Sequence, residues 1–161
     1  MRDWQEIAVP LVAQFEGCAR KGSDGLIHPY LDKLPKPPLW TRGYGRTYGI
    51  DGASPAISKE QALAELRQGL TDYAARCLKL APSLATRPEC LAAVTSWAWN
   101  CGVGAFKVSR LRRAINAGQW THAAQLITRP RTSGGVEVKG LARRRDAEAA
   151  VFAGNLEPAG S

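Results

Sequence analysis

The stretch WQEIAVPLVAQFEG, residues 4–17, decides the fold together with the glycine- and proline-rich sequence that follows it. Its apolar residues recur at the spacing i, i+3, i+4 that places them on one helical face: Trp4, Ile7, Ala8, Leu11, Val12 and Phe15. Pro10 lies inside this run and favours a kink, because it removes a hydrogen bond. Gly17 is a natural helix end. We therefore expect an amphipathic helix over residues 3–16, with Glu16 at its C-terminal end.

The next part of the chain, residues 21–57, has a different composition. Glycine and proline recur throughout it, which favours turns and short strands over helix. Aromatic residues concentrate near its middle, so a strand or hairpin is expected around residues 39–48. This composition predicts a small, irregular lobe that contains β structure.

The sequence pattern from residue 58 to residue 152 predicts mainly helices. Ser58 and Gln61 form a capping-box pattern at the start of a helix that continues to about Leu80, and Pro82 ends it. Further helices are expected over residues 89–100, 109–117, 119–128 and 141–152. The fold class is thus α+β and mainly α. We expect a single domain over residues 1–161, with a small N-terminal lobe (21–57), a larger helical lobe (58–153) joined by the helix 3–16, and a ligand cleft between the lobes.

Charge narrows the possible partners without choosing one. The 161 residues carry a formal net charge of +8, which favours nucleic acid, anionic lipid or an acidic cell-wall polymer. No segment approaches the roughly 18 apolar residues of a membrane span, and the N-terminus lacks the pattern of a signal peptide. We expect no stable membrane insertion and synthesis in the cytosol.

The cysteines do not form a metal-binding pattern. There is no C-x-x-C pair, and the two histidines add no zinc-site spacing, so no metal is expected. The four cysteines are Cys18, Cys77, Cys90 and Cys101. Two states stay open for them: buried free thiols, or one to two disulfides formed in an oxidising compartment.

Several catalytic patterns are excluded by what surrounds the glycines and serines. The pair Gly43-x-Gly45 lacks the third glycine of a nucleotide site, and there is no Walker sequence or G-x-S-x-G elbow. What remains are two carboxylates, Glu16 and Asp32, followed by Thr41. Glycoside hydrolysis uses one carboxylic acid to protonate the leaving oxygen and a second carboxylate toward the sugar or a water. On the residues alone this signal is weak, because an acidic residue at a helix end is usually a solvated charge.

Several motifs, taken in order, resemble those of phage-type lysozymes. The segments FEG (15–17), YLD (30–32) and TRGYGRT (41–47) resemble that family's active-site stretch, in which a glutamate, an aspartate and a threonine follow one another. Three later segments resemble its helical part: WAWNCGVGAF (97–106), SRLRRAINAG (109–118) and GLARRRDAE (140–148). The resemblance runs from about residue 15 to 152 and implies a lysozyme-like fold.

The resemblance also implies a function. It indicates a glycoside hydrolase, an N-acetylmuramidase that hydrolyses the β-1,4 bond between N-acetylmuramic acid and N-acetylglucosamine in peptidoglycan, without a cofactor and with inversion at the sugar. Glu16 would be the general acid, Asp32 the second carboxylate, and Thr41 its partner in positioning the attacking water. It further implies a monomeric phage endolysin that binds no nucleic acid. Such a protein is made in the host cytoplasm, is released by a holin and acts on the wall in the periplasm.

Four other residues gain expected roles from their places around these motifs. Trp40 and Tyr44 are candidates for stacking on sugar rings, and Arg42 is a candidate for contact with the acidic substrate. The closing-helix motif implies Arg144 as the partner of Glu16. The alternative for residues 143–145 is that all three arginines are solvated or bind wall phosphates. Trp97 and Trp99 lie in an apolar helix and are expected in the core.

The spacers between the three catalytic candidates are longer than is usual in the family. Fifteen residues, 17–31, separate Glu16 from Asp32, and eight, 33–40, separate Asp32 from Thr41. Asp24 lies nearer the usual distance from Glu16. We prefer Asp32, because Tyr30-x-Asp32 matches the family's Tyr-x-Asp, and Asp24 stays the alternative.

Two rival functions remain. A lytic transglycosylase would use Glu16 alone, form anhydro-sugar ends and leave Asp32 and Thr41 without a catalytic role. A basic, non-enzymatic binder of wall polymer or nucleic acid would not depend on Glu16, and its binding would fall steeply with salt.

Overall fold

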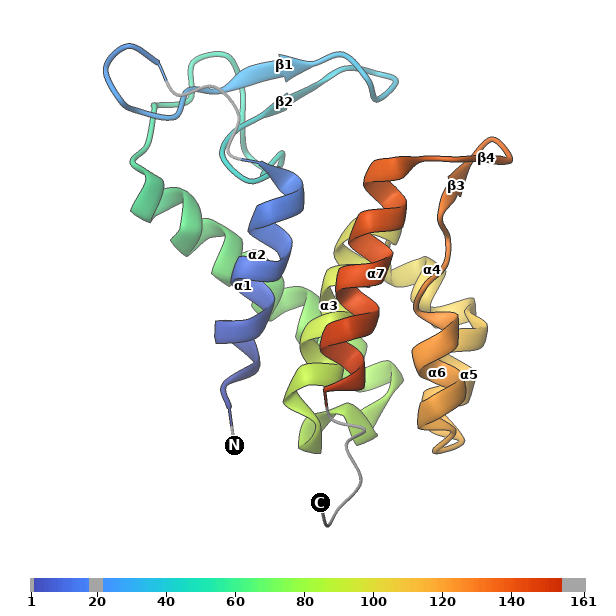
Figure 1. The fold of residues 1–161 in the computed structure, drawn as a ribbon. Coiled ribbons are helices and arrows are strands. Elements are labelled where there is room, and N and C mark those ends of the chain that lie inside the picture. The colour runs from blue at the N-terminus through green and yellow to red at the C-terminus, as the bar shows by residue number, and fades with distance from the viewer. Residues whose placement is uncertain (1, 18–21, 155–161) are drawn as a thin grey trace. The chain divides into compact units, whose positions relative to one another are not determined.

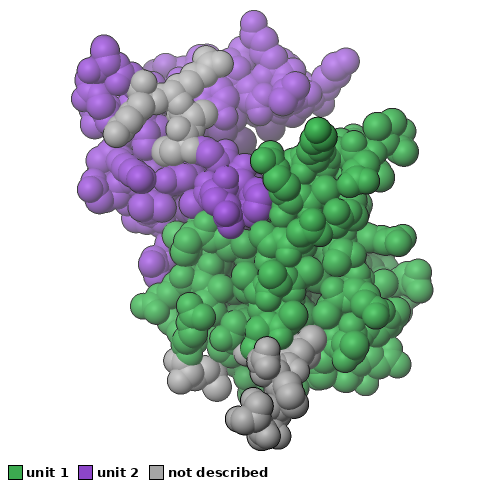
Figure 2. Space-filling model, viewed as in Figure 1, with its two compact units in different colours: residues 1–11, 70–161 green, residues 12–69 purple. Residues whose placement is uncertain are grey.

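The computed structural model describes residues 2–17 and 22–154. The chain divides into two compact units (Figure 2): unit 1 holds residues 1–11 and 70–161, and unit 2 holds residues 12–69. The divisions fall inside two helices, α1 (Trp4–Glu16) and α2 (Lys59–Leu80), so each of these helices contributes residues to both units.

Unit 1 is helical and is built around α3 (Pro88–Cys101). Every residue of this helix from Cys90 to Ala98 is buried, as expected for a helix that is apolar or small on all sides. Alanines and Ser96 along α3 leave space for α7 (Lys139–Ala153), which packs along it (Figure 1). The central helix that the sequence predicts over residues 89–100 is confirmed.

The other helices of unit 1 are short. The predicted helices 109–117 and 119–128 are confirmed as α5 (Arg110–Asn116) and α6 (Trp120–Leu126), and a 3-10 turn η1 (Pro82–Thr86) follows α2 where Pro82 was expected to end it. The sequence does not predict α4 (Val103–Val108), because Gly102 and Gly104 favour a helix end and a turn in this segment. Gly102 explains this, because its positive φ of 99° ends α3 and the chain then re-enters a helix at once.

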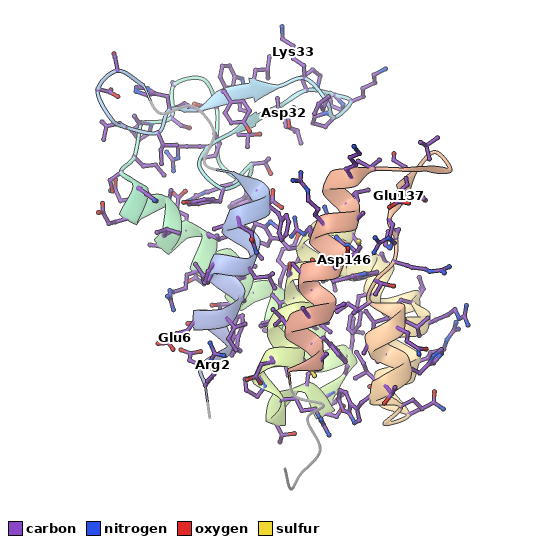
Figure 3. All side chains as sticks on the ribbon, in the orientation of Figure 1. Arg2, Glu6, Asp32, Lys33, Glu137 and Asp146 are labelled. Carbon is purple, nitrogen blue, oxygen red and sulfur yellow. The ribbon has the colours of Figure 1, made fainter. Side chains whose placement is uncertain are left out.

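A small hairpin precedes α7. Strands β3 (Thr132–Ser133) and β4 (Val136–Glu137) pair antiparallel around two glycines with positive φ, as a tight hairpin turn requires. Arg131, just before β3, forms ion pairs with Asp146 on α7 (2.6 Å) and Glu137 on β4 (3.8 Å), both labelled in Figure 3. The sequence did not predict this hairpin, because strands of two residues carry no periodicity.

The core of unit 1 includes one of the two tryptophans that the sequence places there, Trp97, but not Trp99. Trp97 is buried among residues such as Phe106, and its indole N–H donates to the Arg129 carbonyl at 2.7 Å. Trp99 is only partly buried and stacks at a tilt on Tyr73, with ring centroids 4.9 Å apart.

The cysteines described by the structure are not joined by disulfides. Burial raises the pKa of the Cys77 thiol to about 12. The Cys90 thiol donates to the Phe152 carbonyl at 3.5 Å, and burial also raises the pKa of Cys101. Cys18 lies outside the described residues, so the question of its pairing stays open.

Unit 2 contains the predicted β structure. Strands β1 (Tyr30–Asp32) and β2 (Leu39–Thr41) form a two-stranded antiparallel sheet. Buried Ile27 and Ile57 form a backbone bridge at the two ends of the irregular segment. The expected strand around residues 39–48 is shorter than predicted, because β2 ends at Thr41 and the chain turns.

The start of α2 matches its prediction at atomic detail. The Ser58 hydroxyl accepts from the Gln61 backbone N–H at 3.1 Å, and the Gln61 side-chain oxygen accepts from the Ser58 N–H at 2.8 Å. This reciprocal capping box satisfies two of the backbone donors at the helix start. It also fixes the first turns of α2, which contact the candidate site.

Candidate active site

Glu16 is the last residue of α1 and is half buried. The helix ends there because Gly17 adopts a positive φ of 60°, with its N–H still donating to the Ala13 carbonyl at 3.2 Å. The glutamate is thus held on regular helix while the chain leaves it immediately. A side chain on a rigid element keeps its position better than one on a loop.

A tight turn lies against the Glu16 carboxylate. Arg42 and Arg46 exchange backbone hydrogen bonds of 2.9 and 3.1 Å, and these enclose the three residues Gly43-Tyr44-Gly45. Gly45 has a φ of 93°, and a Cβ added to it would lie 3.4 Å from Glu16 Oε2. The positive φ favours glycine at this position, and the backbone there lies within van der Waals range of the carboxylate.

The hairpin β1–β2 brings Asp32 and Thr41 to one face. Its register pairs Tyr30 with Thr41, Leu31 with Trp40 and Asp32 with Leu39. Directly opposed residues share a face, and so do residues two apart along a strand. Asp32 and Thr41 are therefore diagonal neighbours on that face, at a separation of about 7–8 Å between backbone positions.

Both side chains are ordered by local hydrogen bonds. The Thr41 hydroxyl is buried and donates to the Leu39 carbonyl at 3.3 Å. Asp32 Oδ1 accepts from the Leu34 N–H at 3.0 Å, which fixes the carboxylate at the end of β1. Both candidates therefore lie on one hairpin face, and residues 42–45 lead from Thr41 to the Glu16 carboxylate.

Asp24, the alternative second carboxylate, lies on the loop before β1. Its carboxylate is engaged by His28 at 2.9 Å and by the Leu26 N–H at 2.9 Å. The Leu26 N–H, and to a lesser degree His28, lower the pKa of Asp24. The strand register therefore places Asp32 beside Thr41 and gives Asp24 no such relation.

The three predicted substrate contacts are placed differently from one another. Trp40 lies on the opposite hairpin face from Asp32 and Thr41, beside Leu31, and a Cβ at Gly52 would come within 2.9 Å of its indole. Tyr44 is 7% exposed, so its ring is not presented to a sugar from the turn surface. This burial could not be predicted from the sequence, because Tyr44 lies in a turn between two glycines.

Arg42 is committed to the protein itself. It is 6% exposed, and its guanidinium donates to the Pro55 carbonyl at 2.7 Å and to Glu65 Oε1 at 2.6 Å. A direct contact between Arg42 and an acidic substrate is not what this geometry supports. Its sequence neighbours are functional candidates, but its own role is to anchor the turn.

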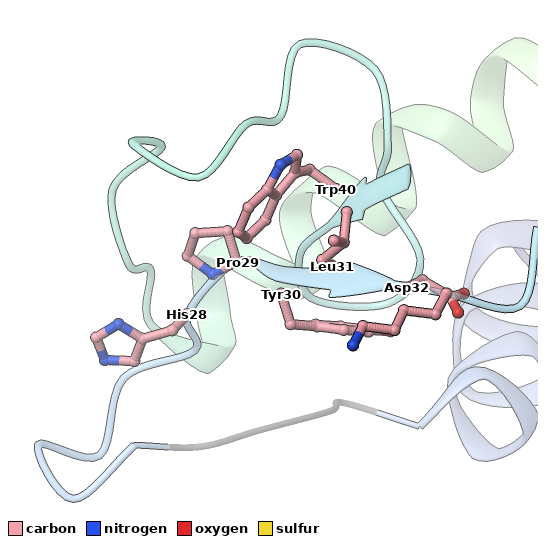
Figure 4. A pocket seen from close by; sticks show the side chains of 7 residues that line it. His28, Pro29, Tyr30, Leu31, Asp32 and Trp40 are labelled. Atoms are coloured by element: carbon pink, nitrogen blue, oxygen red, sulfur yellow. The ribbon is translucent and has the colours of Figure 1, made fainter. Parts of the chain in front are cut away.

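A pocket of about 610 Å³ opens at the outer edge of β1 (Figure 4). It is lined by residues 28–33 and Trp40, so it joins the Asp32 backbone to the face that carries Leu31 and Trp40. Figure 4 shows Trp40 and Leu31 on one side of the strand and Tyr30 on the other, in agreement with the register. Trp40 therefore borders a space in which a ligand could contact its indole.

Arg144 belongs to unit 1 and lies in a buried polar cluster. Its Nε donates to Glu148 Oε1 at 3.1 Å, and its Nη2 donates to the Ser96 carbonyl at 3.1 Å. Ser96 Oγ donates to Glu148 Oε1 at 2.6 Å, and Arg145 Nη1 lies 3.2 Å from Glu148 Oε2. The burial of all three ionic residues excludes the solvated alternative for Arg144 and Arg145. The predicted pairing of Arg144 with Glu16 would join the two units and stays a prediction.

Glu148 is the main residue of this cluster to which the sequence assigned no role. It is fully buried, and burial raises its pKa while the Arg145 guanidinium opposes the shift. A signal was present, since Arg144 and Arg145 precede Glu148 by four and three residues on one helix.

Neither metal nor membrane features were found in the part of the chain that the structure describes. Within residues 2–17 and 22–154, no three His, Cys, Asp or Glu side chains gather as a metal site. No described helix is both long and apolar enough to cross a membrane.

The chain is similar to known proteins over most of its length. A family model described as phage lysozyme matches residues 13–148. The endolysin of Bacillus phage B103 is 31% identical over 148 residues, which cover 91% of this chain and 52% of the relative. The endolysin of Bacillus phage PZA is 33% identical over 152 residues, covering 91% and 54%. The chain therefore spans about half the length of these curated relatives.

A solved structure shows the same fold. The muramidase domain of SpmX from Asticaccaulis excentricus superposes with a TM-score of 0.74 at 26% sequence identity, covering 94% of this chain and 98% of that one. This agreement confirms the predicted fold class, a mainly helical protein with a small β-containing part.

Proposed function

Because the chain belongs to the phage lysozyme family, we propose that it is a muramidase that hydrolyses the glycan strands of bacterial peptidoglycan. The bond cleaved is the β-1,4 linkage between N-acetylmuramic acid and N-acetylglucosamine. The relatives' common name, endolysin, supports a role in host lysis.

One observation carries this proposal at the level of residues. The hairpin that holds Asp32 and Thr41 on one face continues directly into the turn whose Gly45 lies against the Glu16 carboxylate. All of these residues belong to unit 2, so a single compact unit holds the three candidates. Precise holding of reacting groups is what lowers the barrier in such a site.

The proposed chemistry divides the work between the two carboxyl groups. Glu16, in its protonated form, donates its proton to the glycosidic oxygen as the bond to the sugar breaks. A water attacks the anomeric carbon and gives a proton to Asp32. The Thr41 hydroxyl donates its hydrogen bond to the Leu39 carbonyl oxygen. The lone pairs of Thr41 Oγ1 are therefore directed to accept a hydrogen bond from that water and orient it.

The experiment that tests the proposal is digestion of purified peptidoglycan by the wild-type protein and by Glu16→Gln, followed by mass analysis of the released muropeptides. We expect reducing muramic ends from the wild type and none above background from Glu16→Gln. Glu6→Gln is the matched control, because Glu6 is an exposed glutamate in the first turn of the same helix (Figure 3). Release of anhydro ends would identify a transglycosylase, and no release by the wild type would leave only wall binding.

The variants Asp32→Asn and Thr41→Ala test the second half of the mechanism. Hydrolysis requires both groups at the water, so Asp32→Asn should lose about 100-fold or more in rate, the lower range for a lost acid–base group, and Thr41→Ala should also be slower. Asp24→Asn is the control and should keep wild-type activity. Near-normal rates in Asp32→Asn and Thr41→Ala would contradict the hydrolase mechanism.

We further propose that the protein acts as a monomer and reaches the wall from the host cytoplasm after release by a holin. The net charge of +8 supports attachment to an anionic wall polymer. Attachment of this kind weakens as salt screens the charges, so wall binding should decline between low and high ionic strength.

A further inference from the structure

Glu65, on the second turn of α2, links both arginines that flank the Gly43-Tyr44-Gly45 turn. Its Oε1 accepts from Arg42 Nη2 at 2.6 Å and from Arg46 Nη1 at 2.7 Å. We propose that Glu65 is a positioning residue for catalysis, which holds this turn at the distance from Glu16 that the reaction requires. The inference rests on the proposed function, since it takes Glu16 and Thr41 as the reacting groups.

The two arginines reach Glu65 because of the turn's geometry. Arg42 and Arg46 are bridge partners across the turn, so their side chains leave the backbone on the same side. The single oxygen Glu65 Oε1 thereby links the residue before the turn, Arg42, to the residue after it, Arg46. Pro55 adds a third anchor, because its carbonyl accepts from Arg42 Nη1 at 2.7 Å.

The environment makes this linkage stronger than an ordinary surface ion pair. The Arg42 side chain is 7% exposed and that of Glu65 is 20% exposed, whereas that of Arg46 is 42% exposed. Partly buried pairs are screened less by water and salt than exposed ones. Without the carboxylate, two guanidinium groups would face each other across the turn with no negative charge between them.

The backbone of the turn lies between α2 and Glu16, so the anchors on the turn also determine its position relative to Glu16. On the α2 side, a Cβ added to Gly43 would lie 3.3 Å from the Ala62 Cβ, and Ala62 precedes Glu65 by three residues on the same helix face. On the other side, Gly45 meets Glu16 Oε2. The turn is thus held between α2 and the candidate acid, and Thr41 lies directly before it.

Removal of the Glu65 charge should therefore act on the chemical step. A displacement of about 1 Å between reacting groups costs on the order of 100-fold in rate. Because Glu65 itself does not touch the proposed substrate, binding should change little.

The test measures kcat and KM for uncross-linked peptidoglycan glycan strands in solution, at a temperature well below the unfolding midpoint of each variant. Glu65→Gln keeps the size of the side chain and removes its charge, and we expect kcat to fall about 10- to 100-fold with KM within about twofold. Glu60→Gln is the control, an exposed glutamate on the first turn of the same helix, and should keep both constants.

Arg46→Gln tests the positioning role of Glu65 from its other partner. It removes only the exposed partner, so the protein should fold normally and lose a smaller part of kcat. The double variant Glu65→Gln/Arg46→Gln should be no slower than Glu65→Gln, because the linkage to Arg46 is already lost. An unchanged kcat in both single variants, or a loss of activity that only follows the loss of folded protein, would overturn the inference.

The outcomes separate this inference from the proposed function. If the wild type does not cleave the strands, the proposed function fails. If the wild type cleaves them and Glu65→Gln does so at the same kcat, the function stands and only the role of Glu65 is wrong.

Discussion

Each unit of the molecule contains one glutamate held between two arginines, and the two clusters differ in origin and in purpose. In unit 1, Glu148 lies between Arg144 and Arg145 on a single helix, fully buried. In unit 2, Glu65 on α2 joins two arginines of a distant turn and stays partly exposed. The same charges thus stabilise a helix pair in one unit and position a functional turn in the other.

The difference shows in what each cluster contacts. Glu148 and Arg144 share Ser96, so the cluster lies between α7 and α3 at the centre of the helical core. Glu65 contacts a turn whose backbone reaches the candidate acid. We therefore expect substitutions in the first cluster to change mainly stability and those in the second to change mainly rate.

The largest expected effect on stability is that of Glu148→Gln. The substitution removes the buried carboxylate that Arg144 and Arg145 share, and breaking a buried ion pair typically costs about 3–5 kcal/mol of unfolding free energy. Denaturant unfolding, followed by circular dichroism, measures the loss. A cost as small as that of Glu65→Gln would remove the distinction drawn between the clusters.

Gly45→Ala should separate stability from activity within unit 2. A side chain at a φ of 93° costs about 1–2 kcal/mol, and the new Cβ would lie against Glu16 Oε2. Gly25→Ala is the matched control, because Gly25 also has a positive φ of 75° but has open space around its Cβ position. We expect similar unfolding free energies for the two variants, with strongly reduced muropeptide release only in Gly45→Ala. Equal activity in both would contradict a functional role for the turn.

A smaller effect is expected from Ser58→Ala, which removes the cap of α2. The lost hydrogen bond to the Gln61 N–H should cost about 1 kcal/mol. Ser109, which caps α5 in unit 1 by accepting from the Arg112 N–H at 3.0 Å, offers the comparison Ser109→Ala with a similar cost. Because α2 carries Ala62 and Glu65, only Ser58→Ala should also lower activity, measured below the unfolding transition.

The smallest effect is expected from Asp146→Asn, which breaks an exposed ion pair. The hydrogen bond from Arg131 lowers the pKa of Asp146, so the charged form is favoured in the folded state. This contribution is present above the ordinary pKa of 3.8 and is lost as the pH falls through the lower folded value. The small stability difference between wild type and Asp146→Asn should therefore vanish in strong acid, as thermal unfolding at pH 7 and pH 2 would show.

The parts of this fold that follow from the sequence depend on neighbours along the chain. The capping box at Ser58 and Gln61 and the long amphipathic or buried helices all arise from residues within a few positions of each other. The Arg144–Glu148 pair could have been inferred in the same way from its i, i+4 spacing. Family motifs then added the candidates Glu16, Asp32 and Thr41, which residue patterns alone left open.

The parts that could not be predicted depend on long-range contacts. Glu65 lies 23 residues from Arg42 and 19 from Arg46 along the chain. The residues next to the two arginines therefore do not indicate that they form ion pairs with Glu65. The hydrogen bonds of Arg42 to Glu65 and Pro55 could likewise not be inferred from its position between Thr41 and Gly43. The face that Trp40 takes could not be predicted either, because a three-residue strand is too short to show it until its partner strand is known.

The short pairing between β1 and β2 has an evolutionary consequence. Residues 33–38 form the hairpin's end and lie outside the paired positions, so changes in their number leave the register of Asp32 and Thr41 intact. An insertion within the paired residues would instead turn every following side chain to the opposite face. Changes in the length of this hairpin tip can therefore accumulate without changing how Asp32 and Thr41 are placed relative to each other.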